Sequence, residues 1–167
     1  FATGDYTLEK VLRTTTLSGG FFSIDYYHSA IARSEIRFGI GNHSQGGDTW
    51  GIAYFSHYYY VNGAVSGYRT TYSTANITDG ERHHIELVRS GGVYTLRVDG
   101  SDDNSTSSTS GTVVSLTGNN GVIIGSLSFS STFFSGDYDQ IRISNGIARH
   151  TSNFTPPEES FDDLIIG

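Results

Sequence analysis

The sequence predicts an all-β protein, a two-sheet antiparallel jelly-roll sandwich. Short runs in which apolar and polar residues alternate recur along the 167 residues, and turn formers, among them 21 glycines, separate these runs. No segment keeps a helical period, and no fixed repeat indicates a propeller. A chain of this length forms one domain, and about a dozen short strands within it fit two packed sheets.

The clearest element is a hairpin predicted for residues 81–100. Apolar residues occupy every second position of 85–87 and of 94–98, which is typical of strands that place one face on a core. Ser90-Gly91-Gly92 lies between the two runs and predicts a tight turn, because glycine reaches positive φ without a Cβ clash. Asp99-Gly100 predicts a second turn where the hairpin ends.

The other strands are assigned from the same alternation. Before the hairpin, strands are expected at 6–8, 21–27, 35–40, 49–61 and 64–73. After it, strands are expected at 112–116, 122–125 and 138–144. The polar stretch 101–111 is expected to be a flexible surface loop. Asn145-Gly146 is expected to turn the chain into an irregular segment that ends at Pro156-Pro157.

Composition excludes several classes of partner and chemistry. Ten basic and seventeen acidic side chains leave a net charge of −7, which repels the phosphate backbone of nucleic acid. No run approaches the roughly 20 apolar residues that a membrane-spanning helix needs. Cysteine is absent, so disulfides, thiol catalysis and thiolate metal sites are excluded.

Two stretches carry a resemblance to a known family. Residues 79–89 and 96–100, with the paired histidines His83-His84, resemble the central hairpin of the laminin G-like, concanavalin A-like lectin/glucanase superfamily, although Arg82 stands where a tryptophan is usual. Residues 136–157 are similar to the closing motif of bacteriophage and bacterial surface versions of this domain. The resemblance implies an extracellular or virion-surface protein. It also implies partners such as cell-surface glycans, other copies of the chain or other structural subunits.

The chain is expected to divide into a sandwich of residues 1–157 and a tail of residues 158–167. The stretch 161–167 looks like the opening strand that family members usually carry before the equivalent of Phe1. A sandwich that lacks an edge strand exposes backbone groups that can accept a strand from elsewhere. The tail is therefore expected to complete a sheet in its own domain or in a neighbour, or else to lie on the surface of its own domain.

Aromatic side chains are the candidate sugar-binding groups, because their faces stack on pyranose rings. The strand at 49–61 is the most aromatic of the chain, and alternate positions of a strand share a face. One aromatic face is expected to be core and the other a binding surface or a subunit contact. The candidate ligand-binding residues are Trp50, Tyr54, Tyr58 and Tyr60.

The sequence requires no cofactor, and calcium is the metal that its loops would suit. Carboxylate and amide oxygens on loops match a hard cation, and the superfamily often holds calcium at the sandwich rim. The candidate calcium ligands are Asp48, Asp102, Asp103 and Asn104. His83 and His84 point to opposite faces of a strand and cannot share a metal, so one is expected in the interior and the other in solvent.

The sequence predicts no catalysis. Glycoside hydrolysis needs two carboxylates flanking the bond, and the Glu-x-Asp-x-x-Glu-like strand of the glucanase branch is absent. Glu9 and Glu86 each stand alone on their strands, while Asp137 and Asp139 share a face within the closing motif. The favoured function is a non-catalytic structural or adhesion module on a virion or other extracellular assembly, with glycan binding as its activity. The alternative is a lectin-type carbohydrate-binding module of a secreted enzyme.

Overall fold

The computed structural model describes residues 4–17, 19–29, 32–43, 49–61, 64–107, 119–126 and 133–158, and it confirms the all-β prediction. Among these residues there are ten strands and no helix, so no helix there is long and apolar enough to cross a membrane. The strands are β1 (Tyr6–Arg13), β2 (Gly19–Ser29), β3 (Ala32–His43), β4 (Thr49–Val61), β5 (Ala64–Asn76), β6 (Arg82–Ser90), β7 (Val93–Val98), β8 (Ser101–Ser107), β9 (Asn119–Ile124) and β10 (Asp137–Asn145).

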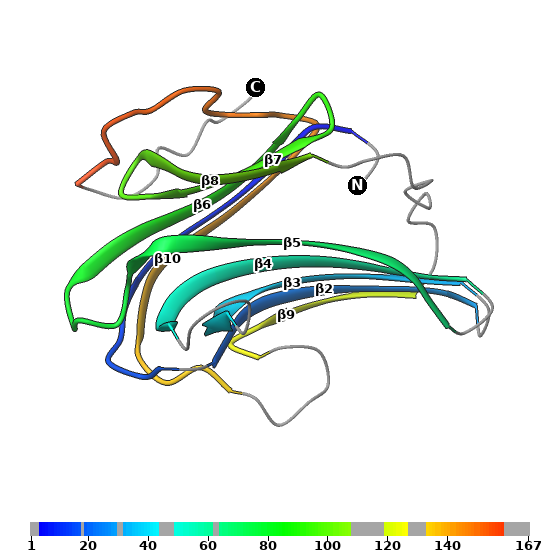
Figure 1. The fold of residues 1–167 in the computed structure, drawn as a ribbon, viewed down its shortest axis with the longest axis horizontal. Coiled ribbons are helices and arrows are strands. Elements are labelled where there is room, and N and C mark those ends of the chain that lie inside the picture. Colours follow the sequence, from blue (N-terminus) through cyan, green and yellow to red (C-terminus); the bar gives the residue numbers. More distant parts are fainter. Residues whose placement is uncertain are drawn as a thin grey trace, which may run out of the picture.

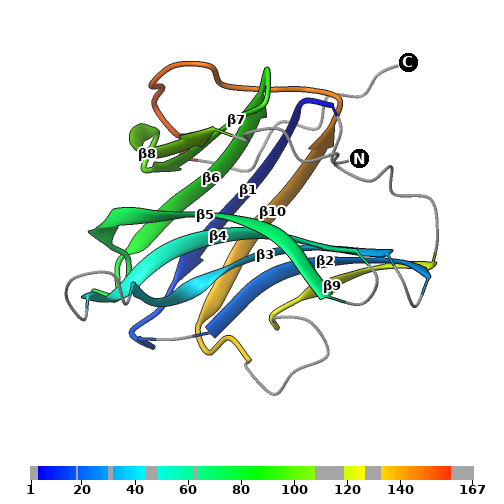
Figure 2. The ribbon, with the colours of Figure 1, turned by 45° about the vertical axis from the view of Figure 1, so that its right-hand side comes forward.

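The strands form two antiparallel sheets that pack face to face (Figures 1 and 2). Sheet A has the order β10-β1-β6-β7-β8, and sheet B has the order β5-β4-β3-β2-β9. The first and last strands of the described chain are therefore neighbours in sheet A, which closes the fold through contacts between residues far apart in sequence.

The core lies between the two sheets and follows the alternation of the sequence. In β1, Tyr6, Leu8 and Leu12 are buried against sheet B. Tyr94 of sheet A stacks on Phe55 of sheet B, with ring centroids 5.0 Å apart. Burial of a side chain of this size contributes about 1.5–3 kcal/mol, so these positions supply much of the stability.

Both predicted turns of the central hairpin are confirmed. Gly91 and Gly92, between β6 and β7, have φ of 54° and 87°, and Asp99 and Gly100, between β7 and β8, have φ of 51° and 76°. Positive φ at both central residues is the requirement of a type I′ turn, whose twist matches that of the flanking strands.

The expected loop at 101–111 is wrong in its first part, because residues Ser101–Ser107 form β8 at the edge of sheet A. The type I′ turn returns the chain antiparallel to β7, so the backbone pairs although the side chains are polar. The carboxylate of Asp103 accepts hydrogen bonds from the backbone N–H of Thr74 and Ala75 and also contacts the Thr74 hydroxyl, and these bonds tie β8 to the edge of sheet B.

After β10 the chain crosses the outer face of sheet A as the irregular segment that the sequence predicts (Figures 1 and 2). We call residues 146–157 the closing segment. Near its start the Thr7 hydroxyl donates to the Ile147 carbonyl, and the Arg149 N–H donates to the Thr7 hydroxyl. Farther along, the Phe154 N–H donates to the Gly100 carbonyl at 2.9 Å. The segment thus runs from β10 across the sheet to the turn before β8.

Three predicted features lie outside the described residues. They are Asp48, the strand expected at 112–116 and the tail stretch 161–167.

Candidate functional site

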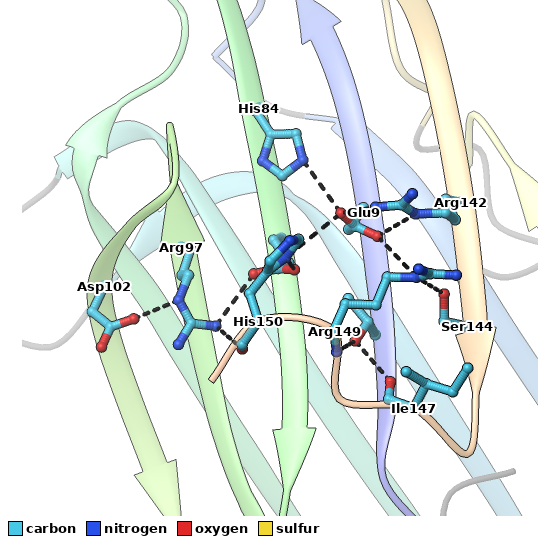
Figure 3. Close-up of polar contacts among 11 residues, drawn as sticks. Glu9, His84, Arg97, Asp102, Arg142, Ser144, Ile147, Arg149 and His150 are labelled. Carbon is cyan, nitrogen blue, oxygen red and sulfur yellow. Dashed lines mark hydrogen bonds and ion pairs between the residues drawn. The ribbon is translucent and has the colours of Figure 1, made fainter. Parts of the chain in front are cut away.

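The outer face of sheet A holds a cluster of charged side chains beneath the closing segment (Figure 3). Glu9 of β1 and Glu86 of β6 are direct partners across the two strands, and both side chains are 0% exposed. One oxygen of each carboxylate lies within 4.8 Å of the other and of Nδ1 of His150. The two acids are alone on their own strands, as expected, but the register of β1 against β6 brings them together.

Glu9 is held as an ion. Nε and Nη2 of Arg142, on the neighbouring β10, donate to its two oxygens at 2.6 Å each. His84 Nε2 lies 3.6 Å from one of the same oxygens. Burial alone would raise the pKa of Glu9, but the contacts with His84 and Arg142 outweigh burial and leave this pKa below its ordinary value.

Glu86 is paired differently. His150 Nδ1 lies 2.6 Å from one of its oxygens, and Arg97 Nη1 donates to the other at 3.2 Å. Burial raises the pKa of Glu86, and the nearby charge of Glu9 adds to this effect. Arg97 also donates to the His150 carbonyl at 2.9 Å, so one guanidinium joins the sheet to the closing segment.

Aromatic rings cover the cluster. The Phe154 ring stacks on His150, with centroids 3.6 Å apart and planes 10° apart. The same ring meets His84 edge-on at 5.5 Å. The closing segment therefore excludes solvent from the carboxylates with two of its own rings.

The chemistry of the cluster follows from these contacts. Two carboxylates at this separation resemble a hydrolytic pair, and with His150 they are donors that a divalent cation could accept. However, guanidinium groups already pair with both carboxylates, and both glutamate side chains are 0% exposed. A buried cluster of opposite charges of this kind fixes geometry, because removing one partner leaves an uncompensated charge. Its role is to fasten the closing segment to sheet A.

The paired histidines lie on opposite faces of β6, as predicted. His84 is buried under the closing segment, but the expectation that its partner faces solvent is wrong, since the His83 side chain is only 12% exposed. Asp99 and Asp79 bind its two ring nitrogens at 2.8 and 3.0 Å. The hydrogen bond to Asp99, opposed by burial and supported by Asp79, raises the pKa of His83 to about 9.

The described candidate calcium ligands are on strand β8, whose pairing with β7 shifts by one residue at Asp103. Asp102 contacts Arg97 Nε at 2.5 Å, Asp103 bonds to β5, and Asn104 Nδ2 donates to the Tyr72 carbonyl. Asp103 and Asn104 therefore both contact β5, while Asp102 contacts β7. Calcium binding there stays a prediction that would require these contacts to be exchanged.

The candidate sugar-binding aromatics lie on β4. Phe55 is fully buried in the core, as expected for one of the two faces. Tyr54 is half-buried on the other face and lies beside Tyr72, with ring centroids 6.2 Å apart. The strand register places Tyr58 opposite Glu35 and Tyr60 opposite Arg33. The side chains of Trp50, Tyr58 and Tyr60 are outside the described set, so sugar binding by this face stays a prediction.

Solved structures with this fold include two laminin fragments and a pentraxin. Domains LG4-5 of the mouse laminin alpha1 chain superpose with a TM-score of 0.60 and 16% identity, covering 86% of this chain and 36% of that one. The LG1-3 region of the laminin alpha2 chain gives a TM-score of 0.62 and 17% identity, covering 84% and 27%. The native heptameric SAP-like pentraxin from Limulus polyphemus gives a TM-score of 0.51 and 15% identity, covering 83% and 63%. The chain thus spans about a third of the laminin fragments.

The comparison with curated proteins gives no significant match. A family model, described as the concanavalin A-like lectin/glucanases superfamily, matches residues 1–152. This match covers most of the chain, including β1, β10 and the start of the closing segment. The chain therefore belongs to the concanavalin A-like lectin/glucanase superfamily, in its laminin G-like branch.

Proposed function

We propose that the chain is a non-catalytic adhesion or structural module of an extracellular assembly, such as a virion surface, and that it binds glycans without altering them. The observation that carries the proposal is the sealed carboxylate pair. Glu9 and Glu86 are the one pair of neighbouring glutamates among the described residues of sheet A, and both are buried and bonded to arginine. A hydrolase needs such a pair open to its substrate, and the exposed carboxylates of Asp137 and Asp139 are each engaged in an ion pair with an arginine.

The relatives support the same proposal in a general way. Laminin LG domains occur as repeated units of longer chains, as the names LG4-5 and LG1-3 state. A rigid sandwich with a fastened outer face suits a module that presents a surface rather than one that closes over a substrate. Because fold alone does not establish function, the proposal depends on a binding measurement.

The test measures glycan binding and polysaccharide hydrolysis by the same chain. The purified chain is displayed in many copies on beads, incubated with a glycan array, and separately incubated with a panel of polysaccharides. We expect retention on at least one glycan and no release of reducing sugar. Release of reducing sugar that Glu9→Gln or Asp139→Asn abolishes would overturn the proposal in favour of a hydrolase. Absence of all glycan binding would also overturn it.

A further inference from the structure

A second polar site lies on the outer face of sheet A, farther along β1 than the closing segment. Here a groove of about 300 Å³ opens at the ends of β1, β6 and β10. Val11, Arg13, Arg82, Asp137, Tyr138 and Asp139 line it.

The groove depends on a β-bulge. Val11 pairs with Gln140 and Leu12 pairs with Tyr138, so Asp139 is an extra residue in β10. Counted back from Arg142, which faces outward to Glu9, a regular strand would point residue 139 into the sandwich. The bulge turns Asp139 outward, and bulges commonly re-aim a side chain beside a functional site.

The charges in the groove are arranged in an unusual way. Asp137, Arg13 and Arg82 form one row across three strands, so two arginines are direct neighbours. Like charges in this position repel. Asp137 offsets the charge of Arg13 at 3.4 Å, and Asp139 reaches across β1 to Arg82 at 3.1 Å.

These pairs contribute little to stability. All four side chains are between 41% and 77% exposed, and water screens exposed ion pairs. Each aspartate uses only its Oδ2 in the contacts made with the described residues, which leaves Oδ1 available as an acceptor. Each guanidinium likewise keeps donors beyond those it uses. The groove therefore presents acceptors and donors side by side to a ligand.

The ligand that matches this pattern is an uncharged polyol ring. Vicinal hydroxyls can donate to an aspartate and accept from an arginine at the same time. Two positive and two negative groups leave the groove neutral, and the chain carries a net charge of −7, which disfavours polyanions. The volume is at the lower end of small-molecule sites, which suits one or two sugar rings over Val11 and the arginine stems.

We infer that this groove binds the terminal one or two rings of a neutral glycan. The inference rests on the proposed function and assigns it a site other than the aromatic face of β4. It also gives Arg82, which stands where the family usually has tryptophan, a specific role as a hydrogen-bond donor.

The test uses the full chain and two variants of the groove, Arg82→Gln and Asp139→Asn. Glu81→Gln is the matched control, because Glu81 is exposed and adjacent but does not line the groove. Cellobiose, lactose and maltose are the neutral probes, and glucuronic acid and sialyllactose are the charged ones. Binding is followed by NMR titration of backbone amides. Thermal unfolding of each variant verifies that folding is intact.

We expect a neutral probe to shift the amides of Arg13 and Arg82. Both groove variants should weaken binding about tenfold or more, and Glu81→Gln should not. If both groove variants retain the glycan binding seen on the array, the assignment of the binding site to the groove is wrong, while the proposed function stands. If only the charged probes bind, the inference that the ligand is a neutral glycan is overturned. If neither the array nor the probes bind, both proposals fail.

Discussion

Substitution of Gly100 by alanine tests how the closing segment is held. Gly100 is in the type I′ turn before β8 with φ of 76°, and a Cβ there would lie 2.0 Å from the Phe154 carbonyl oxygen and 2.8 Å from Pro156 Cδ. The backbone oxygen cannot swing aside as a flexible side chain could. The closing segment must therefore lift away from the turn in Gly100→Ala.

The expected cost has two parts. The left-handed conformation costs alanine about 1 kcal/mol more than glycine. Lifting the segment also breaks the bond from Phe154 N–H to the Gly100 carbonyl and the bond from Asp102 N–H to Asn153 Oδ1. Each is worth about 1 kcal/mol. The free energy of unfolding should fall by about 3 kcal/mol.

Gly91→Ala is the control, because Gly91 has φ of 54° in the other type I′ turn but no atom within 4 Å of its added Cβ. This variant should lose only about 1 kcal/mol. Urea unfolding followed by fluorescence measures both, and an m-value of about 2 kcal/mol/M converts the losses to midpoint shifts of about 1.5 M and 0.5 M. Equal shifts in the two variants would refute the close approach of the closing segment to Gly100.

The buried cluster and the pairing of His83 with Asp79 and Asp99 supply two more predictions. Glu9→Gln removes the charge that neutralises Arg142, so the free energy of unfolding in urea should fall by about 3 kcal/mol. The control Glu158→Gln changes an exposed residue and should cost almost nothing, and equal losses in the two variants would contradict the role of the cluster. The raised pKa of His83 means that the ionised ring stabilises the fold fully below pH 6.5, and that this contribution is lost as pH rises through about 9. Because water screens the half-exposed partners of His83, His83→Gln should lower the free energy of unfolding by about 1–2 kcal/mol at pH 6 and by much less at pH 10. A loss that does not change with pH would disprove the stabilising role of the ionised ring.

The central hairpin was predictable because its information is local. Alternation assigns β6 and β7, and Gly91-Gly92 and Asp99-Gly100 supply the positive φ that both turns need. The same locality explains the mistake over β8. Its polar residues carry no alternation, and they form a strand only because the preceding turn delivers them to β7.

The candidate sites were less predictable because they depend on strand register. Glu9 and Glu86 are far apart in the chain, and a shift of one residue between β1 and β6 would send one of them to the other face. The bulge at Asp139 likewise depends on the pairing of β10 with β1. No local sequence pattern in β1, β6 or β10 predicts these contacts.

The sequence by itself determined the fold class, the two turns of the hairpin, the irregular closing segment and the resemblance to the concanavalin A-like superfamily. The tertiary structure alone decided that two isolated glutamates form one sealed cluster and that Arg13, Arg82, Asp137 and Asp139 line one groove. The physical reason is that alternation and turn chemistry act between near neighbours in the chain. The sites arise where β1, β6 and β10 pair across long sequence separations, and only the packed sheet sets that register.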